Sequence, residues 1–233
     1  MRRAGTCACV RVWLHVSMNG AVVFVLLGGA GLIGLIVFII RAVKKAALER
    51  NAALREMAGR LGLDYHEDPA PGMFAPTPVV AGMINGRRAR VHEFTRGSGK
   101  NRTRWVAASV QILGTSGLKF TMRSQGPAIF ERIAGAFGYK DIVVGDPQFD
   151  AMFAINGSDE TYLQAALIPE VRARLVAFWP KASGGRITVG DGEAVYEQQG
   201  SLTSARCREN IEKAFPVLGD MVALAEVHAT GAI

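Results

Sequence analysis

The chain has 233 residues, with 27 Lys and Arg against 20 Asp and Glu, a net charge of +7 and a pI near 9.7. Its three cysteines exclude a disulfide-framed secreted scaffold, which needs a denser and even set. An apolar fraction of 49% excludes a disordered chain. A basic balance is typical of proteins that bind nucleic acid or an anionic membrane surface.

The surplus of positive charge lies entirely in the first quarter of the chain. Residues 1–63 hold nine basic and two acidic residues, a net +7, and residues 64–233 hold the remaining 18 of each. A domain that binds nucleic acid normally carries its own basic surplus. The distribution therefore argues against nucleic acid as a partner.

The segment 20–40 has no charged residue over its 21 positions. As a helix it would span roughly 30 Å, the thickness of the hydrocarbon core of a bilayer. We therefore expect a transmembrane helix at 20–40, with the lipid bilayer as a partner. The alternative is a cleaved signal peptide, but the run is longer than a signal core and ends in RAVKK without a small-residue cleavage site.

The flanking basic residues predict the orientation of this helix. Six of them follow the apolar run within residues 41–60, and three precede it. This excess predicts a single-pass membrane protein with its C-terminal domain in the cytoplasm. The N-terminal segment 1–19 has no clear periodicity, and Met18 is a candidate translation start.

A glycine pattern typical of dinucleotide-binding proteins lies inside the apolar run, at Gly29, Gly31 and Gly34. That chemistry also needs a helix that starts at the loop and an acid about 20 residues further on. The chain continues as LIVFII and then becomes basic, so we expect no nucleotide and no other cofactor. Ala30 and Gly34 have the spacing of a helix-pairing face, which leaves a homodimer through this helix as an open alternative.

Residues 41–63 are expected to form a juxtamembrane helix that Gly62 ends. Arg41, Lys44 and Lys45 would lie at the lipid headgroups. The alternative is a stalk that packs on the following domain through an apolar stripe. This stripe holds Val43, Ala47, Leu54, Met57, Ala58 and Leu61. Residues 64–78 are rich in proline and are expected to form a linker.

Residues 79–233 are expected to fold as an α+β domain, an antiparallel β-meander and hairpins packed with helices. PVVAGMI and RRARVHEFTR flank Asn85-Gly86, a strong hairpin signal. Alternating apolar residues predict the third and fourth strands of the meander at 106–112 and 118–122, and a helix is expected at 127–137.

The second half of this domain repeats the same kinds of signal. DIVV (141–144) and MFAIN (152–156) are predicted strands, and Ser158 is a candidate N-cap. The helix that follows should break at Pro169. A second hairpin is expected at Asp191-Gly192, and a last helix at 202–227 with one apolar face.

Residues with obvious catalytic chemistry are few. The four histidines have no ligand spacing, so no metal site is expected, and Cys207 lies on the apolar face of the last helix. We therefore predict a binding or scaffolding domain without a catalytic site, with an unknown protein as a further partner. The alternative is a membrane-anchored enzyme with an unsignatured site that uses Asp64, His66 or Glu67.

One run of positive charge lies on and after the second predicted strand, with Trp105 beside it. It is a candidate contact for an anionic surface, lipid or nucleic acid. The alternative is a solvated strand whose charges discourage edge pairing. The candidate residues are Arg87, Arg88, Arg90, Lys100, Arg102 and Arg104, and the run also includes Arg96.

The segment QFDAMFAINGSDETYLQAALIPEVRARL, behind a short anchor, resembles a group of bacterial single-pass membrane proteins of unknown function. In that group a Phe-Asp-x-x-Phe strand precedes an acidic helix start and a Leu-x-Pro break. The resemblance covers about residues 140–200 and implies a bacterial origin and a membrane-tethered α+β domain, with no catalytic residues to carry over. Together with the predicted anchor, it places the expected protein in the bacterial inner membrane. The matching residues here are Phe149, Asp150, Phe153, Asp159, Leu167 and Pro169.

Overall fold

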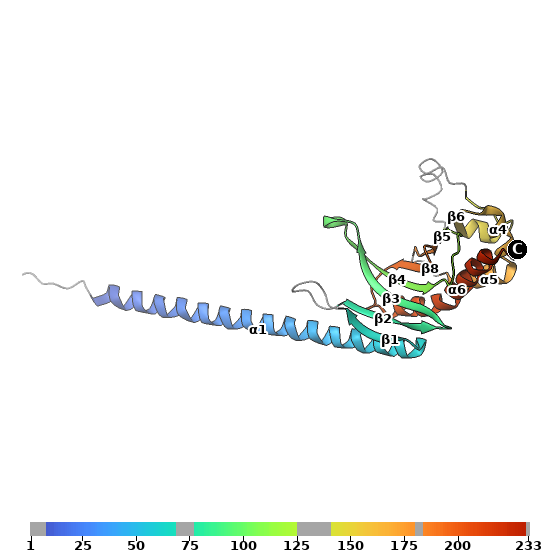
Figure 1. Cartoon of the computed structure of the whole chain (residues 1–233). Coiled ribbons are helices and arrows are strands. Elements are labelled where there is room, and N and C mark those ends of the chain that lie inside the picture. The colour runs from blue at the N-terminus through green and yellow to red at the C-terminus, as the bar shows by residue number, and fades with distance from the viewer. Residues whose placement is uncertain (1–7, 69–76, 125–140, 180–183, 232–233) are drawn as a thin grey trace, which may run out of the picture. The chain divides into compact units, whose positions relative to one another are not determined.

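The computed structural model describes residues 8–68, 77–124, 141–179 and 184–231 (Figure 1). Within its long N-terminal helix, side chains are described at Leu32 and from Gly34 onward. The chain divides into two compact units, Met1–Glu49 and Arg50–Ile233. Each unit is described by itself.

The first unit consists of most of helix α1 (Ala8–Leu61). The glycine pattern at 29–34 lies inside this helix. The backbone there is helical throughout and does not form the strand-loop-helix turn of a dinucleotide site. Of the residues that the structure describes, no helical stretch has both the length and the apolar character needed to cross a bilayer.

The second unit begins with the last turns of α1, which pack into a hydrophobic core. Leu54, Met57 and Ala58 are buried there, whereas Val43 of the predicted stripe is exposed. Gly62 has φ +68 and ends the helix, as predicted, because a left-handed residue suits glycine at this position. The C-terminal part of the stripe therefore belongs to the core of this domain.

The second unit is an α+β domain built on one eight-stranded antiparallel sheet, which confirms the predicted fold class. The order across the sheet is β1-β2-β3-β4-β8-β7-β5-β6. The strands are β1 (Asp64–Asp68), β2 (Thr77–Ile84), β3 (Arg87–Arg96), β4 (Thr103–Gln111), β5 (Phe120–Ser124), β6 (Phe153–Gly157), β7 (Arg186–Gly190) and β8 (Glu193–Gln199).

Both predicted hairpins are present. Asn85 and Gly86 join β2 to β3 with φ values of 50° and 76°, and Asp191 and Gly192 join β7 to β8 with 51° and 83°. Two consecutive positive φ values define the tight turn whose twist matches that of the strands. A 3-10 turn, η1 (Gly99–Asn101), connects β3 to β4.

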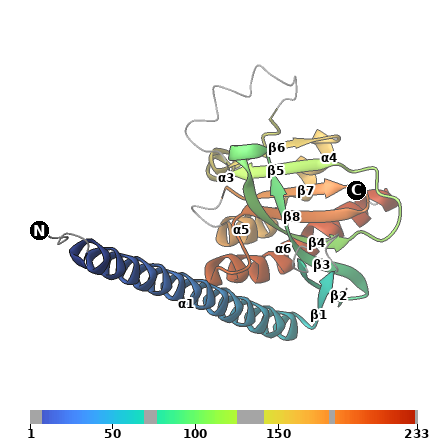
Figure 2. The same ribbon diagram turned by 90° about the vertical axis from the view of Figure 1, so that its left-hand side faces the viewer.

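The predicted meander is wrong at its fourth strand. β4 pairs with β8, and β5 lies between β7 and β6 (Figure 2). Residues 64–68 form edge strand β1 in place of the predicted linker, and 141–144 form no strand. The helix expected at 127–137 lies outside the described residues.

The helices cover one face of the sheet. α6 packs against β4, β8 and β7, and α5 packs against α6. Pro169 starts α5 as predicted, but Asp159 rather than Ser158 caps α4, because its carboxylate accepts from Tyr162 N. The helices are α3 (Pro147–Met152), α4 (Glu160–Ala166), α5 (Pro169–Phe178) and α6 (Ala205–Thr230).

Candidate functional site

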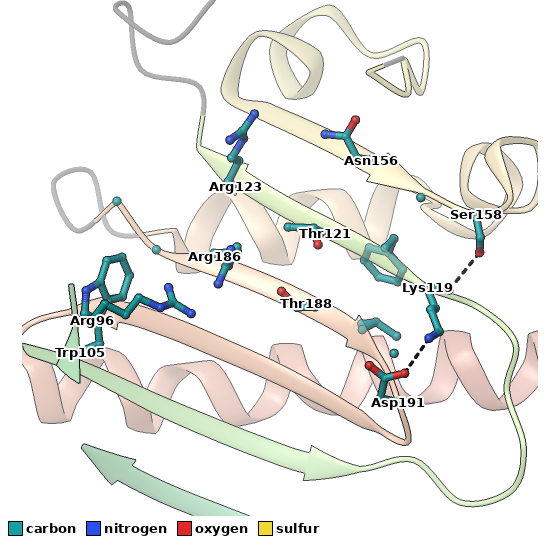
Figure 3. Close-up of a pocket in the computed structure, with 16 residues that line it drawn as sticks. Arg96, Trp105, Lys119, Thr121, Arg123, Asn156, Ser158, Arg186, Thr188 and Asp191 are labelled. Carbon is teal, nitrogen blue, oxygen red and sulfur yellow. Dashed lines mark hydrogen bonds and ion pairs between the residues drawn. The ribbon is translucent and has the colours of Figure 1, made fainter. Parts of the chain in front are cut away.

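A groove of about 740 Å³ lies above β5, β6 and β7, on the face of the sheet opposite α6 (Figure 3). Four cationic side chains line it, together with one carboxylate, three hydroxyl groups and one amide. Most of these groups come from strands that lie far apart in the sequence. They are Arg96, Lys119, Arg123 and Arg186, then Asp191, Thr121, Ser158 and Thr188, and Asn156.

Simple strand alternation places these side chains in the groove. In β5, Phe120 and Met122 are buried in the core, so Thr121 and Arg123 project from the other face. β7 follows the same alternation, with Ile187 and Val189 buried. Its groove residues are Arg186 and Thr188.

Strand register sorts the groove residues into two rows. Thr121 lies directly between Asn156 of β6 and Thr188 of β7. In the next row Arg123 lies opposite Arg186. The side chains of the first row make no hydrogen bond to any residue that the structure describes. They are therefore available as donors and acceptors for a ligand.

One end of the groove is strongly cationic. Glu197 accepts a hydrogen bond from Arg186 Nη2 at 2.6 Å and from Arg96 Nη2 at 2.9 Å. The guanidinium of Arg96 also lies over the rings of Trp105 and Phe94, 4.7 and 5.1 Å from their centroids. These contacts hold both arginines in place, but a single carboxylate neutralises only one of their two charges.

Arg123 adds a second uncompensated charge to this end. It makes no ion pair with any described residue, and its side chain is half-buried rather than extended into solvent. Three guanidinium groups therefore share one carboxylate. The net charge at this end of the groove is about +2 by this count of ionised groups.

The opposite end is electrically balanced. Lys119 Nζ lies 2.6 Å from Asp191 Oδ1, and this contact lowers the pKa of the carboxyl group of Asp191. The backbone N–H of Lys119 donates to Ser158 Oγ at 3.0 Å. The groove is thus asymmetric, with cations at one end, hydroxyl and amide groups in the middle and a neutral ion pair at the other end (Figure 3).

The residues predicted at a membrane interface lie on α1. Arg41, Lys44 and Lys45 are all exposed. Lys45 Nζ lies 3.9 Å from the carboxylate of Glu49, one helical turn later. This i, i+4 pair is exposed, so it contributes little to stability.

The structure divides the predicted cationic run between an ion pair, the groove and the exposed surface. Arg87 is bound by Glu226 through two hydrogen bonds of 2.5 and 3.0 Å, so it is an internal ion pair rather than a contact surface. Arg96, at the other end of β3, lines the groove. The remaining residues are exposed away from the groove: Arg88, Arg90, Lys100, Arg102 and Arg104.

The alternative enzymatic residues lie at the sheet edge on β1. Asp64, His66 and Glu67 are exposed, and none of them lines the groove. Glu67 accepts hydrogen bonds from the hydroxyl of Tyr65 at 2.8 Å and from Asn51 at 3.1 Å. Burial together with the bond to Glu67 raises the pKa of Tyr65 to about 12. These contacts give Glu67 a structural role.

Cys207 is buried in α6, as the sequence indicates. Gln198 Nε2 donates to its Sγ at 2.9 Å and to its backbone carbonyl at 3.1 Å. Burial raises the pKa of this thiol, which keeps it protonated and unreactive. In the described part of the chain, no three His, Cys, Asp or Glu side chains gather as a metal site would require.

Sequence reasoning missed most of the groove. Alternation within β5 and β7 is visible in the sequence and indicates that Thr121, Arg123, Arg186 and Thr188 share the non-core faces of their strands. The pairing of β5 with β6 and β7 is not visible, because these strands follow β5 only after about 28 and 61 intervening residues. The sequence therefore gives no sign that Arg123 and Arg186 lie side by side.

The chain was compared with known protein families, curated proteins and solved structures. No known protein-family profile matches the chain, and no curated protein matches its sequence. A solved structure similar to this chain is the mycobacterial trehalose monomycolate transport factor A, TtfA, with 12% sequence identity and a TM-score of 0.46. The similarity covers 76% of this chain and 95% of the other.

Proposed function

We propose that this protein is a single-pass protein of the bacterial inner membrane that holds a ligand-binding or scaffolding domain at the cytoplasmic surface. The groove above β5, β6 and β7 is its binding site. The row of Asn156, Thr121 and Thr188 carries this proposal, because the three polar side chains have no hydrogen-bond partner among the described residues. A half-buried polar group without a partner in the protein is well placed to bind a ligand.

The anchor is the helical segment 20–40. Its large side chains are exposed wherever the structure describes them, including Leu32 at 59% and Phe38 at 70%. Burial of such apolar surface in lipid is favourable by about 25 cal/mol per Å². The basic residues Arg41, Lys44 and Lys45 follow at once, which supports a cytoplasmic position for the domain.

Two experiments test the anchor. The full chain should remain in the membrane fraction after high salt and alkaline carbonate, and detergent should release it. A green fluorescent protein fused after Ile233 should fluoresce, whereas alkaline phosphatase fused there should be inactive. Release by salt would contradict the anchor, and an active phosphatase would contradict the orientation.

A photo-crosslinking experiment tests the groove. A benzophenone amino acid replaces Thr121 in the full chain, and in a matched control it replaces Arg206, an exposed residue of α6 that does not line the groove. Irradiation in cells should give adducts at position 121 that position 206 does not give. Equal labelling at both positions, or none at 121, would contradict a binding role for the groove.

A further inference from the structure

The charges at one end of the groove are set by a single row across the sheet. Ala107, Glu197, Arg186 and Arg123 are consecutive cross-strand neighbours on β4, β8, β7 and β5. Glu197 binds Arg186 on one side and also binds Arg96. Arg123 lies beyond Arg186, where no described carboxylate binds it.

This arrangement is unfavourable for the protein alone. Like charges directly opposite each other on neighbouring strands repel. Arg186 is a cross-strand neighbour of Arg123, and a single carboxylate is shared between Arg186 and Arg96. Glu197 neutralises one of the three guanidinium charges, and an anion with two negative charges would neutralise the other two.

The donors at this end are of a kind that binds oxyanions. Each guanidinium presents five N–H groups in a planar fork that matches phosphate oxygens. The hydroxyl of Thr121 lies two residues from Arg123 on the same face of β5, about 7 Å along the strand. A ligand held by Arg123 can therefore reach the polar row beside it.

We propose that the cationic end of the groove binds a doubly charged oxyanion with the chemistry of a phosphate monoester. Arg123 makes the direct contact, and Arg186 and Arg96, oriented by Glu197, complete the charge. The proposal rests on the proposed function of the groove and specifies its ligand class. The phosphate can belong to a soluble molecule or to a lipid headgroup.

Chemical modification of arginine in nanodiscs tests both sources of the phosphate, soluble and lipid, through the same measurement, the modification rate of Arg123. The full chain is placed in phosphatidylcholine nanodiscs and treated with phenylglyoxal, and modification of Arg123 is followed by peptide mass spectrometry, with Arg206 as the internal control. At inorganic phosphate ten times its Kd, the modification rate of Arg123 should fall to about one tenth, and that of Arg206 should not change.

The second arm replaces part of the phosphatidylcholine with phosphatidic acid and omits inorganic phosphate. Protection of Arg123 in this arm alone, or in the first arm alone, supports the proposal and identifies the source as lipid or soluble. Lack of protection in both arms overturns the proposal. If position 121 still gives its specific crosslinks in that case, the groove binds another class of ligand and the proposed function stands.

Two variants test the assignment of roles by calorimetry with whichever probe protects Arg123. Arg123→Gln removes no contact with a described residue, so it should fold, and it should weaken binding at least about tenfold. Glu197→Gln keeps an acceptor oxygen that can orient Arg186 and Arg96 but removes the negative charge that competes with the anion, so it should tighten binding. Unchanged affinity in Arg123→Gln, or weaker binding in a folded Glu197→Gln protein, overturns the assignment.

Discussion

Arg123 and Arg186 lie directly opposite each other on β5 and β7, and Glu197 binds the guanidinium of Arg186 but not that of Arg123. Within the described residues, Arg123 is therefore a charge without a structural partner. Groups of this kind stabilise a complex rather than the free protein. A binding role for Arg123 can be distinguished from a structural role, because a substitution that removes its charge should raise the stability of the free protein and weaken ligand binding.

Arg123→Thr should make the protein more stable. The substitution removes a like-charge cross-strand contact and introduces a β-branched residue, so we expect a gain of about 0.5 kcal/mol. Urea unfolding of the full chain in detergent measures it. The control is Arg104→Thr on β4, where the cross-strand neighbour is the neutral Thr95, so only the contribution of the β-branched residue is expected and the gain should be smaller. A loss of stability in Arg123→Thr would show that the side chain has a structural role.

Two glycines in equally open surroundings should respond in opposite ways to alanine. Gly86 has φ +76 in the first hairpin, and an added methyl group would meet nothing within 4 Å, so Gly86→Ala should cost about 1 kcal/mol through backbone strain alone. Gly219 lies inside α6 with the same free space around it, and Gly219→Ala should add about 0.5–1 kcal/mol through helix propensity. Thermal unfolding of the two variants compares them directly, and shifts of the same sign would contradict this explanation.

These hairpins also show what can be predicted from the sequence. Asn85-Gly86 and Asp191-Gly192 are identified correctly because their turn chemistry is local: two positive φ values are needed, and both dipeptides supply them. Gly62 and Pro169 end and start their helices for equally local reasons. The α+β class and the apolar face of α6 follow from periodicity alone.

The errors that hid the groove concern neighbours that lie far apart in the sequence. The alternation of buried and exposed side chains in β5 is predicted correctly. Its pairing with β4 is not, because residues 112–119 between the two strands contain no two-residue turn that would make them a hairpin. β5 pairs with β6 and β7 instead. Sequence alone places Arg87 in a surface run because its partner Glu226 lies 139 residues away. The groove depends on the same long-range pairing, so its charge could not be predicted from composition.

The ion pair of Arg87 and Glu226 should make stability depend on acid pH. Hydrogen bonds from Arg87 are the main cause of a lowered pKa for Glu226, and Leu113 N donates to the same carboxylate at 2.9 Å. The ionised form therefore favours the folded state. This stabilisation is fully present above the unfolded pKa of about 4.3 and is lost as the pH falls through the folded-state pKa.

Glu226→Gln measures this dependence. It should cost about 1 kcal/mol at pH 7 and very little near pH 2–3, where the wild-type carboxyl group is also protonated. Urea unfolding at a series of pH values follows the difference. Glu193→Gln is the control, because Glu193 is exposed and its side chain binds no described residue, so its difference should stay near zero. A cost for Glu226→Gln that is constant with pH would contradict the role of its ionised carboxylate.

Glu93 of β3 should determine how the chain leaves β8 and enters α6. Its carboxylate accepts hydrogen bonds from Ser201 Oγ at 2.7 Å and from the backbone N–H of Leu202, whose side chain is fully buried. Glu93→Ala leaves that N–H without its partner, so we expect a loss of about 1–3 kcal/mol. Glu93→Gln keeps an acceptor oxygen at the same place and should lose less than half as much. Hydrogen exchange provides a local readout, because the amide of Leu202 should exchange faster in Glu93→Ala than in Glu93→Gln. Equal protection of this amide in both variants would mean that the side chain of residue 93 does not fix the connection between β8 and α6.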